Sequence, residues 1–201
     1  MTTATAPLVG HLAPSKKRGY STAWWGMASL IATESMIFLI LLGSYFFLRA
    51  ASKTWPIGGI APPELRYSVP FSFVLWGSSI PIFYADAAIK KGDQRGLRVG
   101  LLLSALMGVA FLLYTARDFN DLTFGWRTNA YGSIYYTIVG LHALHVILGL
   151  GFNVIVQIKA WQGKFTAAHH TSVEVFSLYW HFVDAVWIFV FGSLFLSEAL
   201  R

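Results

Sequence analysis

Four polar residues recur along an apolar segment near the C-terminus at the spacing of a single helical face. Glu174, Ser177, His181 and Asp184 are separated by three, four and three positions, so a helix would carry all four on one side. His181 and Asp184 stand one turn apart and are able to pair. Because charged groups are costly inside a membrane, such a stripe must face protein. A structural hydrogen-bonded cluster is the simpler interpretation, and a part in proton transfer is the alternative.

Two histidines stand one turn apart in a second apolar segment. His142 and His145 share a helical face with Gly149, and small residues allow close contact between membrane helices. Histidines can ligate haem. Two on one face of one helix cannot hold a haem from opposite sides, so His181 would be needed as the second ligand. We therefore favour the interpretation that both bridge helices through hydrogen bonds, with a haem site as the alternative.

A single carboxyl group lies inside the first long apolar segment. Glu34 stands ten residues into this run, which places it roughly 15 Å along a helix and near the middle of a bilayer. Burial disfavours the charged form of an unpaired carboxylate, so we expect Glu34 to be protonated. Asp184 would lie at a similar depth. We predict that Glu34 serves proton transfer or partner contact, against the simpler interpretation of a neutral acid bonded to a neighbouring helix.

The composition excludes a water-soluble protein. Of 201 residues, 56% are hydrophobic and only 12% are charged, half of the roughly 25% that a soluble domain carries. The mean hydropathy is +0.57. The chain has no cysteine, which excludes disulfides and thiolate metal sites. It also lacks a glycine-rich phosphate loop, a nucleophile elbow and an H-E-x-x-H motif. The net charge is +6, and the lysines and arginines lie between the apolar runs. This distribution is typical of membrane proteins, so we expect no nucleic-acid partner.

Five segments are long and apolar enough to cross about 30 Å of hydrocarbon, which takes roughly 20 helical residues. They cover residues 24–48, 69–89, 99–116, 131–158 and 175–197. We therefore predict an all-α integral membrane bundle of five transmembrane helices, residues 21–201, preceded by a disordered N-terminal tail, residues 1–20. The first apolar run is longer than the 7–15 residues typical of a signal peptide, so we expect a retained anchor.

Lysine and arginine are distributed unevenly between the two sides of the predicted bundle. The tail, residues 90–98 and residues 159–171 hold nine of the fifteen, and the opposite side holds six. Positive residues mark the inner loops of membrane proteins. The sequence therefore predicts the N-terminus inside and, after five crossings, the C-terminus outside.

Three stretches carry a resemblance to a known family. Residues 179–187 read Tyr-Trp-His-Phe-Val-Asp-Ala-Val-Trp, residues 131–146 contain Tyr-Gly-Ser and Gly-Leu-His-Ala-Leu-His-Val, and residues 33–38 read Thr-Glu-Ser-Met-Ile-Phe. From about residue 24 to its C-terminus, the chain resembles subunit III of haem-copper terminal oxidases. Longer members of that family have seven helices, and this chain looks like the shorter five-helix bacterial form.

The resemblance implies an accessory, non-redox subunit of a proton-pumping respiratory cytochrome c oxidase in the inner (plasma) membrane of a bacterium. It implies that haem and copper belong to partner subunits I and II and that this chain holds no metal. The resemblance also implies that the subunit supports proton uptake. It further implies that phospholipid is bound in a cleft between the first two helices and the last three. The basic residue that the family presents to a lipid headgroup corresponds to Lys159. The chain departs from mitochondrial-type members at Asp86 and Ala87, where they often have two histidines.

The electron donor and membership of a larger respiratory supercomplex stay open. Glu174 and the adjacent His169 and His170 look more like the cytochrome c branch of the family. Subunit III of a quinol oxidase is the alternative.

Two hypotheses come from other classes of protein. One is a b-type membrane cytochrome that uses His142 or His145 together with His181 as haem ligands. The other is a small proton channel with Glu34 and Asp184 on its path, although the paired glycine- or proline-broken helices expected of carrier sites are missing.

Overall fold

The computed structural model describes residues 19–60 and 65–197, and α-helices account for most of them. The helices are α1 Thr22–Ala51, α2 Leu65–Gly77, α3 Ser79–Lys90, α4 Gln94–Asp121, α5 Ala130–Trp161 and α6 Thr171–Phe191, and a π-helical turn, η1 Gly192–Leu196, continues α6. These two ranges contain no β-strand. The segments α1, α2 with α3, α4, α5, and α6 with η1 are each long and apolar enough to cross a membrane. The predicted all-α, five-span fold is confirmed, while the predicted disordered tail lies, up to residue 18, outside the described residues.

Polar side chains begin three of the helices ahead of their apolar runs. The side chains of Ser21, Asp93 and Asn129 each accept an N–H of the following first turn at 2.9–3.2 Å. Such a cap satisfies an amide that has no partner within the helix. For this reason α1, α4 and α5 begin one to five residues before the predicted spans.

The second span, predicted as one helix over residues 69–89, consists of two helices that meet at Ser78. Pro81 explains the break, because proline has no N–H to donate to the carbonyl four residues earlier and its ring clashes with that carbonyl. That carbonyl belongs to Gly77, the last residue of α2. At the junction, the Ser78 N–H bonds to the carbonyls of Val74 and Leu75, at 3.1 and 2.9 Å.

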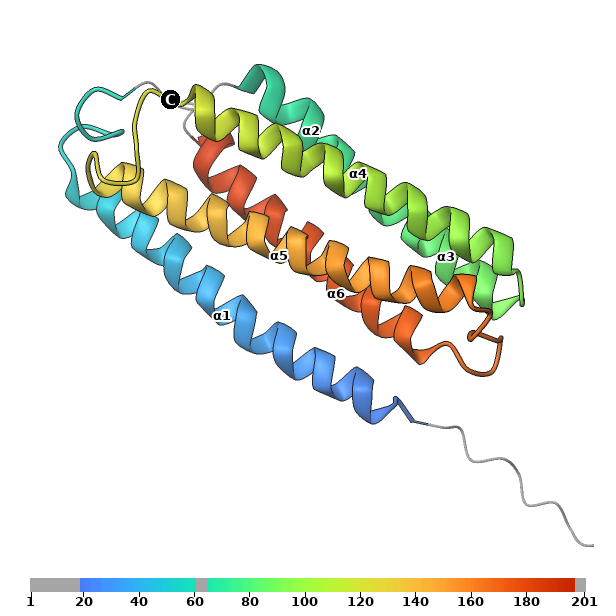
Figure 1. Ribbon diagram of the computed structural model, residues 1–201. Helices are drawn as coiled ribbons and strands as arrows, with labels where there is room; N and C mark the ends of the chain where they lie inside the picture. The colour runs from blue at the N-terminus through green and yellow to red at the C-terminus, as the bar shows by residue number, and fades with distance from the viewer. Residues whose placement is uncertain (1–18, 61–64, 198–201) are drawn as a thin grey trace, which may run out of the picture.

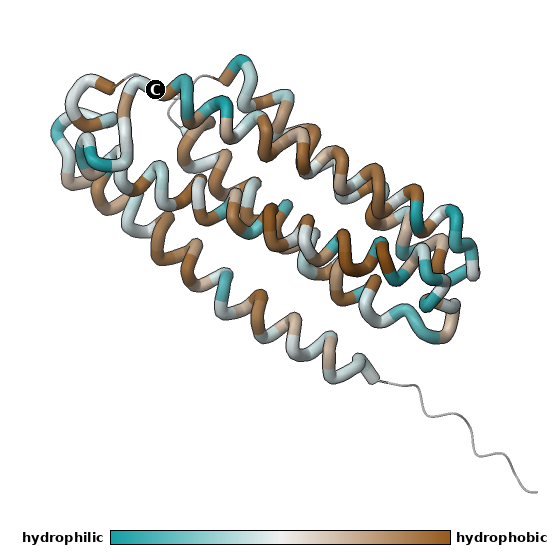
Figure 2. Tube along the Cα trace, in the orientation of Figure 1, coloured by the Kyte–Doolittle hydropathy of each residue, from teal (hydrophilic) through white to brown (hydrophobic). Residues whose placement is uncertain are grey.

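The spans pack around α6, which contacts α1, α2, α3 and α5 (Figure 1). α1 packs against α5 and α6, whereas α2 and α3 pack against α4 and α6. The first two spans share α6 as a neighbour but do not form a pair, and the second span packs closely against α4. The expected cleft between the first two spans and the other three is therefore wrong. Figure 2 shows apolar residues through the middle of the spans and hydrophilic residues gathered in the connections at their ends.

Glycines mark the closest helix contacts, and α1 is the least buried of the five spans. A Cβ at Gly100 of α4 would lie 2.5 Å from the Pro81 carbonyl oxygen of α3. Trp180 of α6 fits against Gly108 of α4 and Gly149 of α5, where a Cβ would lie 2.8 and 3.0 Å from its ring. Only three residues of α1 are buried, namely Phe38, Leu42 and Tyr45. Most of the α1 surface is therefore free to meet lipid or another chain.

Candidate intramembrane polar site

Four of the six predicted polar residues fall into two separate groups. Glu34 of α1 bonds to His145 of α5, whereas His181 and Asp184 of α6 meet α3 through Ser79. Within the described residues, no hydrogen bond joins Glu34 to Asp184. Their similar depth does not bring them together, because Glu34 turns to α5 and Asp184 turns to α3.

Glu34 and His145 form a largely buried pair. The Oε2 of Glu34 lies 3.2 Å from Nε2 of His145, and their side chains are 27% and 7% exposed. The other ring nitrogen, Nδ1, lies 2.8 Å from the Leu141 carbonyl oxygen. A carbonyl only accepts, so Nδ1 carries a hydrogen. The remaining bond is then either a neutral acid donating to imidazole or an imidazolium donating to a carboxylate. In both forms the pair shares one proton and has no net charge.

His142 is buried in an aromatic pocket and is 1% exposed. Its ring lies 4.6 Å from the ring of Trp187 and 5.9 Å from that of Phe111, centroid to centroid. Neither ring nitrogen has a hydrogen-bond partner in the described part of the chain. The prediction that both helix histidines bridge helices through hydrogen bonds is therefore confirmed for His145 and wrong for His142. Since both nitrogens of His145 are engaged, that ring is not free to ligate haem.

Ser79, at the start of α3, joins His181 and Asp184, two of the predicted site residues on α6. Its hydroxyl donates to Oδ2 of Asp184, and its oxygen lies 2.9 Å from Nδ1 of His181. The direct pairing of His181 with Asp184 that their spacing allows is therefore replaced by a bridge through serine. Phe83 stacks on the His181 ring with centroids 4.1 Å apart. Ser79 was not predicted as part of the site, although Pro81 two residues later marks where the span breaks.

Two further serines of the second span bond to tryptophans of α6. The indole N–H of Trp180 donates to Ser78 Oγ at 2.8 Å, and that of Trp187 donates to Ser72 Oγ at 2.9 Å. All four of these groups are buried. The hydroxyls satisfy indole groups that would otherwise be unpaired in an apolar interior. This seam fixes the rotation of α6 against α2 and α3.

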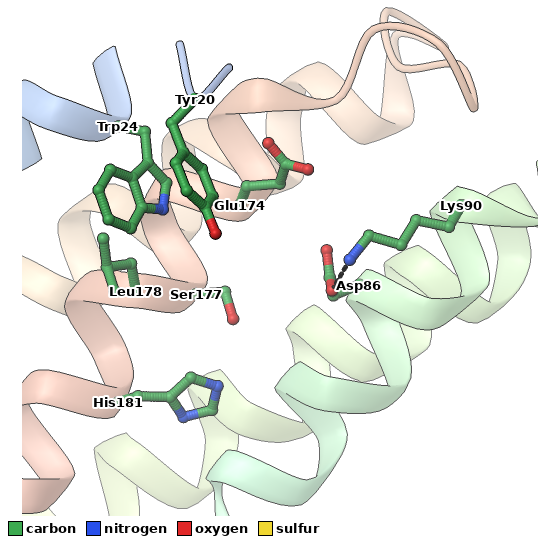
Figure 3. Close-up of a pocket in the computed structure, with 8 residues that line it drawn as sticks. All are labelled: Tyr20, Trp24, Asp86, Lys90, Glu174, Ser177, Leu178 and His181. Carbon is green, nitrogen blue, oxygen red and sulfur yellow. Dashed lines mark hydrogen bonds and ion pairs between the residues drawn. The ribbon is translucent and has the colours of Figure 1, made fainter. Parts of the chain in front are cut away.

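Glu174 lies in the first turn of α6, beside a pocket of about 270 Å³ between α1, α3 and α6. The pocket is lined by Tyr20, Trp24, Asp86, Lys90, Glu174, Ser177, Leu178 and His181 (Figure 3). Lys90 bonds to Asp86 at 2.6 Å, and Glu174 lies 3.2 Å from Nε2 of His170. The pocket lies at the end of the bundle where α1 begins, which we call the predicted inner end. Lys159, in the last turn of α5, is at this end but outside the pocket lining.

Comparison with known proteins identifies the family. The sequence profile described as cytochrome c oxidase subunit III matches residues 4–198. The chain belongs to the cytochrome c oxidase subunit III family. The subunit 3 of Thermostichus vulcanus is 34% identical over 177 residues, which cover 85% of each chain. That of Synechocystis sp. is 35% identical over 175 residues, 86% of this chain and 74% of the relative. That of Coturnix japonica is 29% identical over 192 residues, 92% of this chain and 72% of the relative.

Membership of this family confirms the resemblance found in the sequence, and it defines the general role of the chain as a membrane-embedded oxidase subunit. Two hydrogen-bonded groups of ionisable residues lie inside the bundle, the Glu34–His145 pair and the Ser79–His181–Asp184 group, while His142 is buried apart from both.

Proposed function

We propose that this subunit III is an accessory, non-redox part of a proton-pumping cytochrome c oxidase in a bacterial plasma membrane. Haem and copper would lie in partner subunits I and II. The relatives named above are cytochrome c oxidase subunits, which supports this assignment.

The Glu34–His145 pair carries the proposal that the chain supports proton uptake. A single proton shared by a carboxyl and an imidazole can move between them without creating net charge in a medium of low dielectric. Glu34 keeps 27% of its side chain exposed on α1, the least buried span. A partner subunit that covers α1 would therefore reach this carboxyl group directly.

Replacing Glu34 by glutamine tests the proposal. Glu34→Gln keeps the side-chain shape and a hydrogen bond to His145 but removes the titratable proton. We expect the oxidase to assemble, while turnover, or its resistance to inactivation during sustained turnover, falls most at alkaline pH, where protons are scarce. Oxygen consumption and proton pumping measured from pH 6 to 9 give the answer.

Thr33→Val is the matched control, because among the described residues the Thr33 hydroxyl bonds only to the Leu30 carbonyl of its own helix, at 2.7 Å. It should behave as the parent does. Parent-like turnover and pumping of Glu34→Gln over the whole pH range would contradict the proposal and leave Glu34 as a helix contact.

We also propose cytochrome c as the electron donor and phospholipid as a bound partner. Oxygen consumption with reduced cytochrome c, and none with a quinol, would support cytochrome c as the donor. The reverse result would favour the quinol oxidase alternative.

Lys159 is half-buried in the last turn of α5, where a cation can meet a lipid phosphate. Lys159→Gln should lower the amount of phospholipid that copurifies with the oxidase.

A further inference from the structure

The pocket at the predicted inner end leads along α6 toward a buried carboxyl group. Glu174 and His181 both line it (Figure 3), two helical turns or roughly 10 Å apart along the helix axis. Asp184 lies about one turn further and is 6% exposed. His181 is therefore the residue at which the pocket meets the hydrogen-bonded group of Ser79 and Asp184.

The hydrogen positions in this group follow from its bonds. The Ser79 hydroxyl has one hydrogen, which it donates to Oδ2 of Asp184. The 2.9 Å contact between Ser79 Oγ and His181 Nδ1 must then be an N–H donating to the serine oxygen. A neutral His181 consequently has its lone pair on Nε2. This nitrogen is buried and has no hydrogen-bond partner in residues 19–60 and 65–197.

We propose that His181 and Ser79 form a proton relay that loads and empties the buried carboxyl group of Asp184 from the pocket. A proton from the pocket binds Nε2 of His181, and the Nδ1 proton passes to Ser79 Oγ as the serine hydrogen passes to Oδ2 of Asp184. The products are a neutral imidazole with its hydrogen on Nε2, an intact serine and a neutral carboxylic acid. One proton has been taken up, and the reverse steps return it.

The groups around the relay fit a proton store that is filled from the pocket. At the pocket, α3 contributes Asp86 and Lys90, and α6 contributes Glu174; carboxylates there can collect protons from water. At the far end, Oδ1 of Asp184 has no hydrogen-bond partner among the described residues. Within the described residues the hydrogen-bonded group therefore ends at Asp184. This inference deepens the proposed support of proton uptake by adding a second exchangeable group.

Hydrogen–deuterium exchange of the Asp184 carboxyl group tests the relay. Infrared spectra of the oxidase complex that contains this chain are recorded from pH 5 to 9, and the parent-minus-Asp184→Asn difference assigns the carbonyl band of the protonated acid. The rate at which this band shifts after transfer to D₂O is the measurement. We expect Ser79→Ala and His181→Leu each to slow it about tenfold, which corresponds to ~1.4 kcal/mol in the barrier.

Two matched serine variants separate a relay from a structural contact. Ser79→Thr keeps the hydroxyl and should exchange at the parent's rate. Ser44→Ala removes an exposed hydroxyl that bonds to the Ile40 carbonyl within α1, at 2.9 Å, and should also leave the rate unchanged. Equal rates in the parent and Ser79→Ala, or an Asp184 band absent at every pH, would overturn the relay. The measurement needs no turnover, so its result does not depend on the outcome for Glu34→Gln.

Discussion

At the scale of single residues, two histidines one turn apart on α5 have opposite surroundings. His145 uses both ring nitrogens, one for the Leu141 carbonyl and one for Glu34. His142 faces the rings of Phe111 and Trp187, with neither nitrogen bonded within the described residues. A buried polar group without a hydrogen bond destabilises the folded state, so its removal loses no hydrogen bond. Removal of one member of a bonded pair leaves the other buried and unpaired, which lowers stability. The two residues should therefore respond differently to the same substitution.

We expect His142→Leu to change the unfolding free energy of the oxidase subunit by less than about 1 kcal/mol, because it removes no hydrogen bond seen in the structure. His145→Leu should cost about 1–3 kcal/mol, since it leaves Glu34 without its partner. Thermal unfolding of the two variants in detergent is the comparison. An equal or larger loss for His142→Leu would show that its nitrogens are engaged.

At the scale of elements, proline and glycine decide how α3 meets its neighbours. Pro81 ends α2 at Gly77 and so brings Ser78 and Ser79 to α6. On the other side of α3, Gly100 lets α4 approach the Pro81 carbonyl. The polar group of α6 thus depends on a backbone break that a continuous helix would not provide.

Gly100→Ala should destabilise the contact between α3 and α4, because its Cβ would lie 2.5 Å from backbone oxygen, and overpacking of this kind costs about 1–3 kcal/mol. Gly151→Ala is the matched control in α5, where a Cβ meets nothing within 4 Å. The readout is the unfolding temperature of each variant in detergent. Equal temperatures would mean that the helices separate without cost.

At the scale of the whole molecule, α6 is surrounded by the other spans while α1 stays largely uncovered. The pocket, the turn between α3 and α4 and the loop between α5 and α6 share the predicted inner end. Asp184 would take protons from the compartment that this end of the bundle faces. The excess of lysine and arginine in residues 1–20, 90–98 and 159–171 predicts the cytoplasm.

Reporter fusions test this orientation. A reporter that is active only outside the cytoplasm should be silent when fused after Gln94, at the start of α4, and active when fused at the C-terminus. The opposite pattern would reverse the topology and place the pocket at the outer face.

The sequence by itself determined the class of the molecule and the positions of its spans. Apolar runs of about 20 residues have few stable alternatives to membrane helices, so composition alone led to the five spans. The family resemblance came from local strings such as residues 179–187. Helical periodicity also placed Glu174, His181 and Asp184 on one face correctly, because that depends only on the geometry of one helix.

Only the tertiary structure decided which polar groups meet. Glu34 binds His145 rather than a residue of α6, and Ser79 comes between His181 and Asp184. Spacing along one helix carries no information about the rotation of its neighbours. That rotation is set by contacts far apart in the chain, such as Trp180 against Gly108 and Gly149, because close packing of large rings against glycines leaves few arrangements of the helices.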